Sequence, residues 1–406
     1  MSFQQGLSGL NAAAKNLDAI GNNVANANTV GFKSSGLIFA DVFAASIGAT
    51  AGNSIGIGTT VASVQTSFTQ GNIRTTSNPL DMAINGNGFF RVDVNGAVSY
   101  TRNGQFHLDA NGFIVSATGA KLTGYGVDAQ GNILIANPSP LQISSAQLAA
   151  TATTAGQIGL NLDAREPVVT VTPFNIANSA TYNKATSLTI YDSLGNAHAL
   201  STYYVKTAAN TWDVYAAVDG VALPASIGTL NFNTNGTLNT TTTTLPFNLA
   251  LPIGGGAVTP LTMTLDFTNS TQYGSGFSVD TLEQDGFAAG QLAGYGIDDA
   301  GVVIGRYSNG QTRAMGQLVL ASFKNPHGLQ PLGNNGYAET TASGQPIPGV
   351  PGSSNLGLVQ SGAVEESNVD LTRELVDMIT AQRVYQANAQ TIKTQDQVLN
   401  TLVNLR

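Results

Sequence analysis

Residues 371–403 read L-T-R-E-L-V-D-M-I-T-A-Q-R-V-Y-Q-A-N-A-Q-T-I-K-T-Q-D-Q-V-L-N-T-L-V, and many of their apolar residues recur at alternating gaps of four and three. This spacing keeps side chains on one stripe of a helix. The same spacing begins at Phe3, near the other end of the chain. Because a single helix cannot bury such a stripe, the two ends predict paired helices in a terminal coiled-coil domain.

We call the two stripes together the apolar seam, and we expect it to contact the opposite terminal helix and other copies of the chain. The alternative is a helical hairpin closed within one chain. Ser367, Asn368 or Asp370 is expected to cap the C-terminal helix, because short polar side chains accept hydrogen bonds from its first amides. The seam residues are Phe3, Leu7, Leu10, Leu17, Val24, Leu371, Leu375, Met378, Tyr385, Ile392, Leu399 and Val403.

The chain between the two ends has the pattern of antiparallel β-structure. Short β-branched and aromatic runs are separated by turns such as 93–96 (D-V-N-G), 109–112 (D-A-N-G) and 128–131 (D-A-Q-G). Gly accepts the positive φ that tight hairpin turns require. Trp212, Val214, Ala216 and Val218 alternate with more polar residues, which is the period of a half-buried strand.

An internal echo indicates how the β-structure is organised. Residues 122–133 read L-T-G-Y-G-V-D-A-Q-G-N-I, and residues 292–303 read L-A-G-Y-G-I-D-D-A-G-V-V. The sequence therefore predicts a mainly β protein with α-helical coiled-coil termini and discontinuous, nested β-domains. The expected domains are a terminal helical domain (1–30 and 367–406), an extended connector (31–70 and 355–366), a discontinuous β-domain (71–145 and 285–354) and an inserted outer β-domain (146–284).

Composition excludes several classes of partner. The net charge is -8 and charged residues make up 10% of the chain, without a basic run to neutralise phosphates, so we expect neither nucleic acid nor an anionic membrane as partner. The sequence contains no Cys, and therefore no disulfide or thiolate site. It has no continuous apolar run typical of a cleaved signal peptide or a membrane span. A cytosolic protein or one exported without cleavage fits these features.

Motifs of catalysis are weak, and we expect no enzyme activity, cofactor or metal. His107, His198 and His327 are far apart in sequence and have no second ligand at a suitable spacing. Residues 52–56 match G-x-S-x-G, but their Gly, Ala and Thr flanks do not resemble the strand and helix of a nucleophile elbow. The D-x-N-G turns lack the Glu that closes a calcium loop.

Four segments resemble the axial proteins of the bacterial flagellum, the rod and hook family. The N-terminal signature is A-N-A-N-T-V-G-F-K at 25–33, where the matching residues are Ala25, Asn26, Asn28, Thr29, Gly31, Phe32 and Lys33. The other segments are N-P-L-D-M-A-I-N-G-N-G-F-F at 78–90, Y-T-R-N-G-Q-F at 100–106 and S-N-V-D-L-T-R-E-L-V-D-M-I-T-A-Q-R-V-Y-Q-A-N-A-Q-T-I-K-T-Q-D-Q at 367–397. The large insert resembles hook members more than the shorter distal rod members.

This resemblance implies an extracellular subunit of the flagellum that polymerises into a curved tube and joins the rotary motor to the filament. It also implies export by the type III apparatus without a cleaved signal peptide. The implied partners are further copies of the chain, the distal rod protein, the hook cap protein, the hook-filament junction protein and the export apparatus. The competing interpretations are a distal rod or hook-associated axial protein and, from another class, a secreted adhesin or enzyme with coiled-coil ends.

Overall fold

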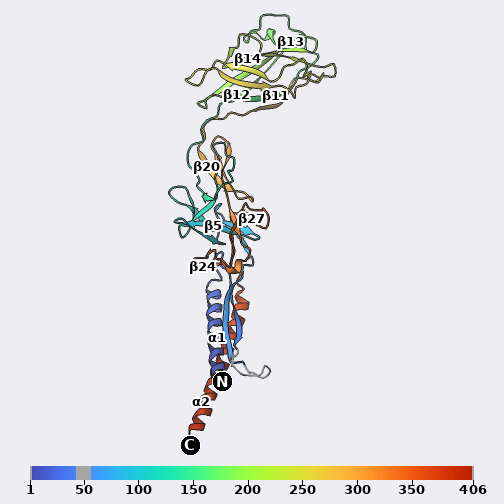
Figure 1. The fold of residues 1–406 in the computed structure, drawn as a ribbon. Coiled ribbons are helices and arrows are strands. Elements are labelled where there is room, and N and C mark those ends of the chain that lie inside the picture. Colours follow the sequence, from blue (N-terminus) through green and yellow to red (C-terminus); the bar gives the residue numbers. More distant parts are fainter. Residues whose placement is uncertain (1, 43–55, 405–406) are drawn as a thin grey trace. The chain divides into compact units, whose positions relative to one another are not determined.

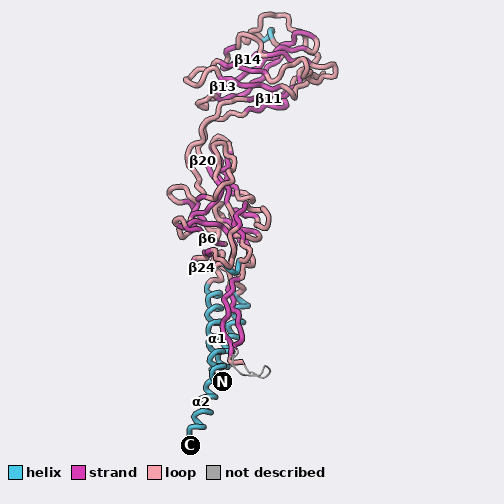
Figure 2. Tube along the Cα trace, viewed as in Figure 1, coloured by secondary structure: helices cyan, strands magenta, loops and turns pink. Residues whose placement is uncertain are grey.

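The computed structural model describes the backbone of residues 2–42 and 56–404 and the side chains of residues 3–42 and 56–401. It confirms the predicted fold class, since most elements are β-strands and the two long helices lie at the ends of the chain (Figures 1 and 2). The chain divides into two compact units. The first comprises residues 1–144, 294–305 and 312–406, and the second comprises residues 145–293 and 306–311.

The N-terminal helix α1 spans Ser2–Ala25, which is shorter than the expected helical segment of 1–30. Local hydrogen bonds replace the helical pattern after Ala25. The Asn26 side chain donates to Asn22 O, and the Thr29 hydroxyl donates to Asn26 Oδ1. Gly31 then has φ +70°, a conformation that favours glycine and directs the chain away from the helix axis.

The C-terminal helix α2 spans Leu371–Asn404. Of the three predicted cap residues, Asp370 is the cap: its Oδ1 accepts hydrogen bonds from Thr372 N at 2.9 Å and Arg373 N at 3.2 Å. Its negative charge also complements the positive end of the helix dipole. Asn368 makes a different set of contacts, described below.

The segment expected to be an extended connector contains a hairpin instead. Strands β1 (Ser35–Val42) and β2 (Gly58–Thr66) pair in antiparallel register from Ser35 opposite Thr66 to Val42 opposite Gly58. The expectation of a connector rested on the uncharged run from Val42 to Ile73 and on its abundance of Gly and Ala. The β-branched residues of 59–66 suit a strand, but no apolar–polar alternation marks the hairpin in the sequence.

The remainder of the first unit is β-structure. Two short antiparallel pairs, β3 (Ile73–Thr75) with β28 (Ala363–Glu365) and β4 (Met82–Asn85) with β27 (Leu358–Ser361), tie its beginning to its end. Eight strands of the largest sheet lie side by side in the order β20 (Leu292–Ile297), β21 (Val302–Tyr307), β22 (Thr312–Leu318), β9 (Lys121–Tyr125), β5 (Phe89–Val94), β6 (Ala97–Thr101), β25 (Gly336–Ala338) and β24 (Gln330–Gly333). Five short strands pair with members of this sheet or with one another: β7 (Phe106–Leu108), β8 (Ile114–Ser116), β10 (Ser139–Pro140), β23 (Leu320–Ser322) and β26 (Ile347–Gly349).

The D-x-x-G segments are turns, as the sequence predicted. Residues 93–96 join β5 to β6, and residues 109–112 join β7 to β8. In the latter turn, Asp109 Oδ1 accepts hydrogen bonds from the amides of Asn111 and Phe113, both at 2.8 Å. The carboxylate is thus occupied by the turn itself, which is the behaviour expected of an Asx turn.

The second unit contains two sheets around one apolar core. One sheet has the order β17 (Phe247–Leu251), β18 (Leu261–Asp266), β11 (Ala155–Asn161), β19 (Ser278–Gln284), and the other is formed by β12 (Lys184–Tyr191), β13 (Ala197–Ala208), β14 (Thr211–Val218), β15 (Val221–Ala222) and β16 (Gly228–Asn231). The predicted alternation is confirmed, because Trp212, Val214, Ala216 and Val218 are all buried in this core. Trp212 Nε1 donates to Gln272 Oε1 at 2.8 Å.

The second unit extends beyond the expected insert of 146–284. Bridges between Thr151 and Phe287 and between Leu148 and Gly290 keep the returning strand with this unit. The first unit likewise combines the terminal helices with the inner β-structure, which the sequence assigned to separate domains. Short 3-10 turns occur at Ser179–Thr181 and Pro326–Gly328.

Candidate functional site

The two terminal helices lie side by side in antiparallel orientation (Figure 1). Near one end, Asn23 Nδ2 donates to Glu374 Oε1 at 3.0 Å. Near the other, a Cβ atom added to Gly6 would meet Ile392 Cγ1 at 3.1 Å, and one added to Gly9 would meet Asn388 Oδ1 at 2.8 Å. Small residues on α1 therefore let the helices approach closely.

The face of α1 that meets α2 and the hairpin is not the predicted seam. It consists of Gly6, Gly9, Ala13, Asn16, Ile20 and Asn23, which we call the small face. These positions also alternate at gaps of three and four, but on a neighbouring side of the helix. Ala13 and Ile20 are each 6% exposed, whereas Phe3 is 46% and Leu7 is 44% exposed.

The seam residues of α2 differ in exposure: some are half-buried and others are exposed. Met378 and Ile392 are half-buried, whereas Leu371, Leu375, Tyr385 and Leu399 are exposed, Leu375 to 49%. On α1, Leu10, Leu17 and Val24 are half-buried. The structure thus pairs the two helices within one chain and leaves much of the seam outside this pair. The side chain of Val403 lies outside the described residues.

The hairpin β1–β2 is attached to α1 at both of its ends. Asn23 and Ser35 exchange two hydrogen bonds of 2.9 Å, one in each direction. At the opposite end, Gln5 Nε2 donates to Gly56 O at 2.6 Å and Thr59 N donates to Ser8 Oγ at 3.3 Å. Polar residues of α1 are therefore used to fix the hairpin along the helix.

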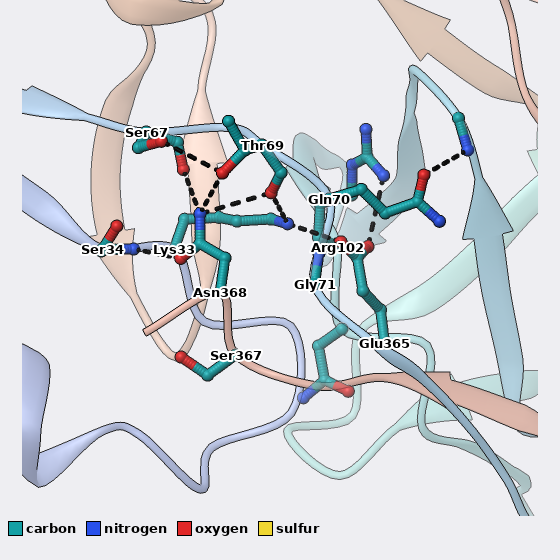
Figure 3. A network of polar contacts seen from close by, with 12 residues as sticks. Lys33, Ser34, Ser67, Thr69, Gln70, Gly71, Arg102, Glu365, Ser367 and Asn368 are labelled. Atoms are coloured by element: carbon teal, nitrogen blue, oxygen red, sulfur yellow. Dashed lines mark hydrogen bonds and ion pairs between the residues drawn. The ribbon is translucent and has the colours of Figure 1, made fainter. Parts of the chain in front are cut away.

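Beyond the C-terminal end of α1, the end of the N-terminal signature enters a buried polar junction (Figure 3). The side chains of Lys33 and Glu365 are fully buried, and Lys33 Nζ lies 2.5 Å from Glu365 Oε1. Lys33 Nζ also donates to Thr69 O at 2.7 Å. Burial lowers the pKa of Lys33, and the neighbouring carboxylate of Glu365 opposes this shift.

Glu365 is the centre of this junction. Its Oε2 accepts from Arg102 Nη1 at 3.2 Å, its Oε1 accepts from Gly71 N at 2.9 Å, and its main-chain oxygen accepts from Gly31 N at 2.8 Å. The Arg102 guanidinium also lies over the Phe89 ring, 5.3 Å from the ring centre. One carboxylate therefore holds two cations and a main-chain amide in a site closed to water.

Asn368 completes the junction on the side of the helices. Its Oδ1 accepts from Ser34 N at 2.8 Å, and its Nδ2 donates to Ser67 O and Thr69 Oγ1, both at 2.9 Å (Figure 3). Of the signature residues, Ala25 ends α1, Asn26 and Thr29 bond each other, Asn28 is exposed and Phe32 is half-buried. The structure brings Gly31 and Lys33 into the junction and keeps the others around the helix end.

Sequence reasoning missed both the small face and the role of Glu365. The small face had a signal, because its residues repeat at gaps of three and four just as the seam does. For Glu365, the signal was a carboxylate just before the C-terminal signature in a chain poor in charge. The distance of 332 residues between Lys33 and Glu365 hid their pairing.

Among residues 2–42 and 56–404, no group of three His, Cys, Asp or Glu side chains is placed to hold a metal ion. Most of the G-x-S-x-G match, residues 52–55, lies outside the described residues. Neither α1 nor α2, nor any other described helix, combines the length and hydropathy of a membrane span.

Comparisons with known proteins agree with this architecture. The family model "Flagella basal body rod protein" matches residues 3–33, "Flagellar basal body protein FlaE D2 domain" matches residues 161–287, and "Flagellar basal body rod FlgEFG protein C-terminal" matches residues 360–405. The flagellar hook protein FlgE of Escherichia coli K12 is 47% identical over the full length of both chains. The chain belongs to the FlgE family of flagellar hook proteins.

Other members of the FlgE family are similar along the whole chain. The hook protein FlgE of Salmonella typhimurium LT2 is 47% identical, and that of Rhizobium meliloti 1021 is 36% identical, each over 100% of this chain. The crystal structure of Helicobacter pylori hook protein FlgE2 covers 71% of this chain and 99% of its own, with a TM-score of 0.55 and 15% identity, which shows a shared fold. This is a family of structural proteins of the flagellum.

Proposed function

We propose that this chain is the structural subunit of a flagellar hook and that it polymerises into a curved, flexible tube through its terminal helices. Such a tube acts as a universal joint that transmits torque from the motor and rod to the filament. Membership of the FlgE family supports the hook assignment. The exposed seam supports the mode of assembly.

The exposed seam is the observation that carries this proposal. Pairing through the small face leaves large apolar side chains on the outer sides of both helices. Of the seam residues, Phe3, Leu7, Leu371, Leu375, Tyr385 and Leu399 are each at least 37% exposed. Contiguous exposed apolar surface on a folded chain marks an interaction site. Since every copy carries the same surface, a second copy is the partner that fits it.

Non-closing contacts between identical subunits generate a helical polymer. Each Leu or Ile that a neighbour covers contributes about 1.5–3 kcal/mol, so a few seam residues per subunit are sufficient to hold a tube together. The end of α2 strengthens this argument. It continues for twelve residues beyond Ile392, the contact of Gly6, and exposes Val398 to 48% and Leu399 to 50%.

Flexibility would arise from the β-units rather than from the seam. Charged residues make up only 10% of the chain, and Thr, Asn, Ser and Gly supply much of its polar surface. Contacts of this kind are individually weak and can be exchanged between neighbours without one dominant ion pair. We infer that such surfaces slide as the tube turns about its curved axis, while the helices keep the axis.

The remaining assignments follow from this role. We infer export through the flagellar type III apparatus without a cleaved signal peptide, and contacts with the distal rod protein, the hook cap protein and the hook-filament junction protein. The flagellum is the location that the relatives support. We infer that the chain has no catalytic function.

Electron microscopy of concentrated protein tests assembly, and a pair of variants tests the seam. Leu375→Asp places an unpaired carboxylate at an exposed seam position, and burial of that charge against a neighbour is costly. We expect this variant to keep its folded β-units, to form no tubes and to leave cells non-motile. Thr372→Asp is the control, because Thr372 is exposed on the same helix but lies off the seam.

The wild-type chain and the control are expected to form curved tubes. Discrete oligomers of the wild-type chain would favour the adhesin interpretation. Normal tubes from Leu375→Asp, or equal loss of assembly in both variants, would show that this stripe is not the assembly surface.

A further inference from the structure

The buried junction contains more positively charged than negatively charged side chains. Among the described residues, Glu365 is the one carboxylate that forms an ion pair with Lys33 or Arg102. Lys33 and Glu365 are 0% exposed and Arg102 is 3% exposed at their side chains. In addition, Arg102 Nε is buried without a hydrogen-bond partner in this part of the structure. Two cations thus depend on a single anion.

That anion comes from the opposite end of the chain. Glu365 is separated by 332 residues from Lys33, by 294 from Gly71 and by 263 from Arg102. Without the segment around Glu365, docking of Lys33 beside Arg102 would bury two positive charges with no counterion. Burial of an uncompensated charge is strongly unfavourable. The N-terminal signature therefore has a physical reason to stay undocked until the C-terminal segment arrives.

Hydrogen bonds of three consecutive residues connect the junction to the helix pair. Lys33 bonds Glu365, Ser34 N donates to Asn368, and Ser35 N donates to Asn23, whose side chain in turn donates to Glu374. Each of these hydrogen bonds joins the N-terminal part of the chain to the C-terminal part, or the loop after α1 to α1 itself. The position of the junction thereby fixes where α1 begins to pair with α2.

We propose that Glu365 is a positioning residue for assembly: its carboxylate is the counterion that lets the N-terminal signature dock, and docking sets the register in which α1 and α2 pair. This proposal rests on the proposed function for its consequence in assembly. It predicts that the terminal helices adopt their pairing only in a chain that carries this carboxylate.

Amide hydrogen exchange in the full-length, unassembled chain tests the proposal at two defined sites. Gly31 N donates to Glu365 O, and Gly71 N donates to Glu365 Oε1. In Glu365→Gln, which keeps the shape of the side chain, we expect exchange at both amides to accelerate by about 100-fold or more, because two buried cations lose their counterion. Exchange in the central strand β5 is expected to stay unchanged.

Glu366→Gln is the matched control. Glu366 is the next residue, and its carboxylate pairs with Arg74 at 3.0 Å, but both side chains are exposed, to 43% and 59%. Its loss is expected to leave exchange at Gly31 and Gly71 within about twofold of wild type, since exposed pairs contribute little. Equal acceleration in the two glutamate variants would overturn the proposal.

A second test compares the removal of one cation with the removal of the anion. Because the junction has more cations than anions, the two removals should have unequal effects. Lys33→Met leaves Arg102 and Glu365 as a balanced pair, so we expect it to accelerate exchange at Gly71 at least tenfold less than Glu365→Gln does. Adding Lys33→Met to Glu365→Gln is expected to restore part of the lost protection, because one of the two unpaired cations is removed. If Lys33→Met alone is as damaging as Glu365→Gln, Glu365 is not the centre of the junction.

The outcomes separate this proposal from the hook function. Unprotected Gly31 in the wild-type chain, or acceleration in Glu365→Gln that extends equally to β5, would overturn the positioning role. Neither result would contradict the proposal that the wild-type chain forms hooks. Accelerated exchange confined to the junction, together with misassembly of Glu365→Gln, supports the proposal.

Discussion

Individual charged residues have specific structural roles in this chain because they are rare. In the junction, the carboxylate of Glu365 forms ion pairs with cations from two distant segments. In the second unit, His198 bridges two acids: its Nδ1 lies 2.6 Å from Asp219 Oδ2, and its Nε2 lies 3.3 Å from Asp192 Oδ2. Sequence reasoning found no second ligand at a suitable spacing for His198. The approach of the two acids depends on strand register, because Asp192 follows β12 and Asp219 follows β14, the two strands that pair with β13.

The His198 cluster makes the stability of the second unit depend on pH. The hydrogen bond to Asp219 raises the pKa of His198, and burial opposes this shift. Although burial disfavours ionisation of Asp192, hydrogen bonds from Asn196 and His198 lower the pKa of this carboxyl to about 2. A raised histidine pKa stabilises the fold fully below the unfolded value of about 6.5, and this contribution is lost as pH rises through the folded value.

We therefore expect the free energy of unfolding of the second unit to fall as pH rises above about 6.5. His198→Gln should flatten this dependence, because the titrating group is gone. The measurement is denaturant unfolding of the full chain followed by the fluorescence of Trp212, the single tryptophan, which is buried in this unit. The exposed His107 gives the control His107→Gln, and a flat profile in the wild type would contradict the assignment.

At the scale of the element, α1 divides its surface between two tasks. The small face contacts α2 and the hairpin, whereas Phe3 and Leu7 of the apolar seam are exposed. The spacing of residues 3–24 predicted the helix, and the alternation around Trp212 predicted a strand, since both depend on local periodicity. The choice of face could not be predicted in the same way, because it depends on the approach of Gly6 and Gly9 to α2.

Substitutions at two glycines of α1 test whether the small face is the side of the helix that pairs with α2. Leu at position 9 would force its side chain against Asn388, whereas position 21 has no neighbouring atom within 4 Å of an added Cβ. Both substitutions replace a poor helix former. We expect Gly9→Leu to accelerate amide exchange in α1 by about tenfold or more through overpacking, and Gly21→Leu to preserve or increase protection. Identical behaviour of the two variants would show that the helices do not pair through the small face.

At the scale of the whole molecule, the chain forms two compact units from separated segments, and its two terminal helices pair. The echo between residues 122–133 and 292–303 was sufficient to predict discontinuous β-structure, because the two segments enter the same sheet through β9 and β20. The exact limits of the units depend on bridges such as that between Leu148 and Gly290, which carry no sequence signal. We propose that in this arrangement the ends supply assembly and the β-units supply the deformable surface.

The central claim is that the seam becomes buried against other copies when the chain assembles. The chain has no native Cys, so a single cysteine can be labelled without interference. Position 375 is 49% exposed in the unassembled chain. We therefore measure the rate of thiol labelling of Leu375→Cys before and after tube formation, with Thr372→Cys as the off-seam control. The account predicts that labelling at 375 slows at least tenfold in tubes while labelling at 372 changes little; unchanged labelling at 375 in well-formed tubes would contradict it.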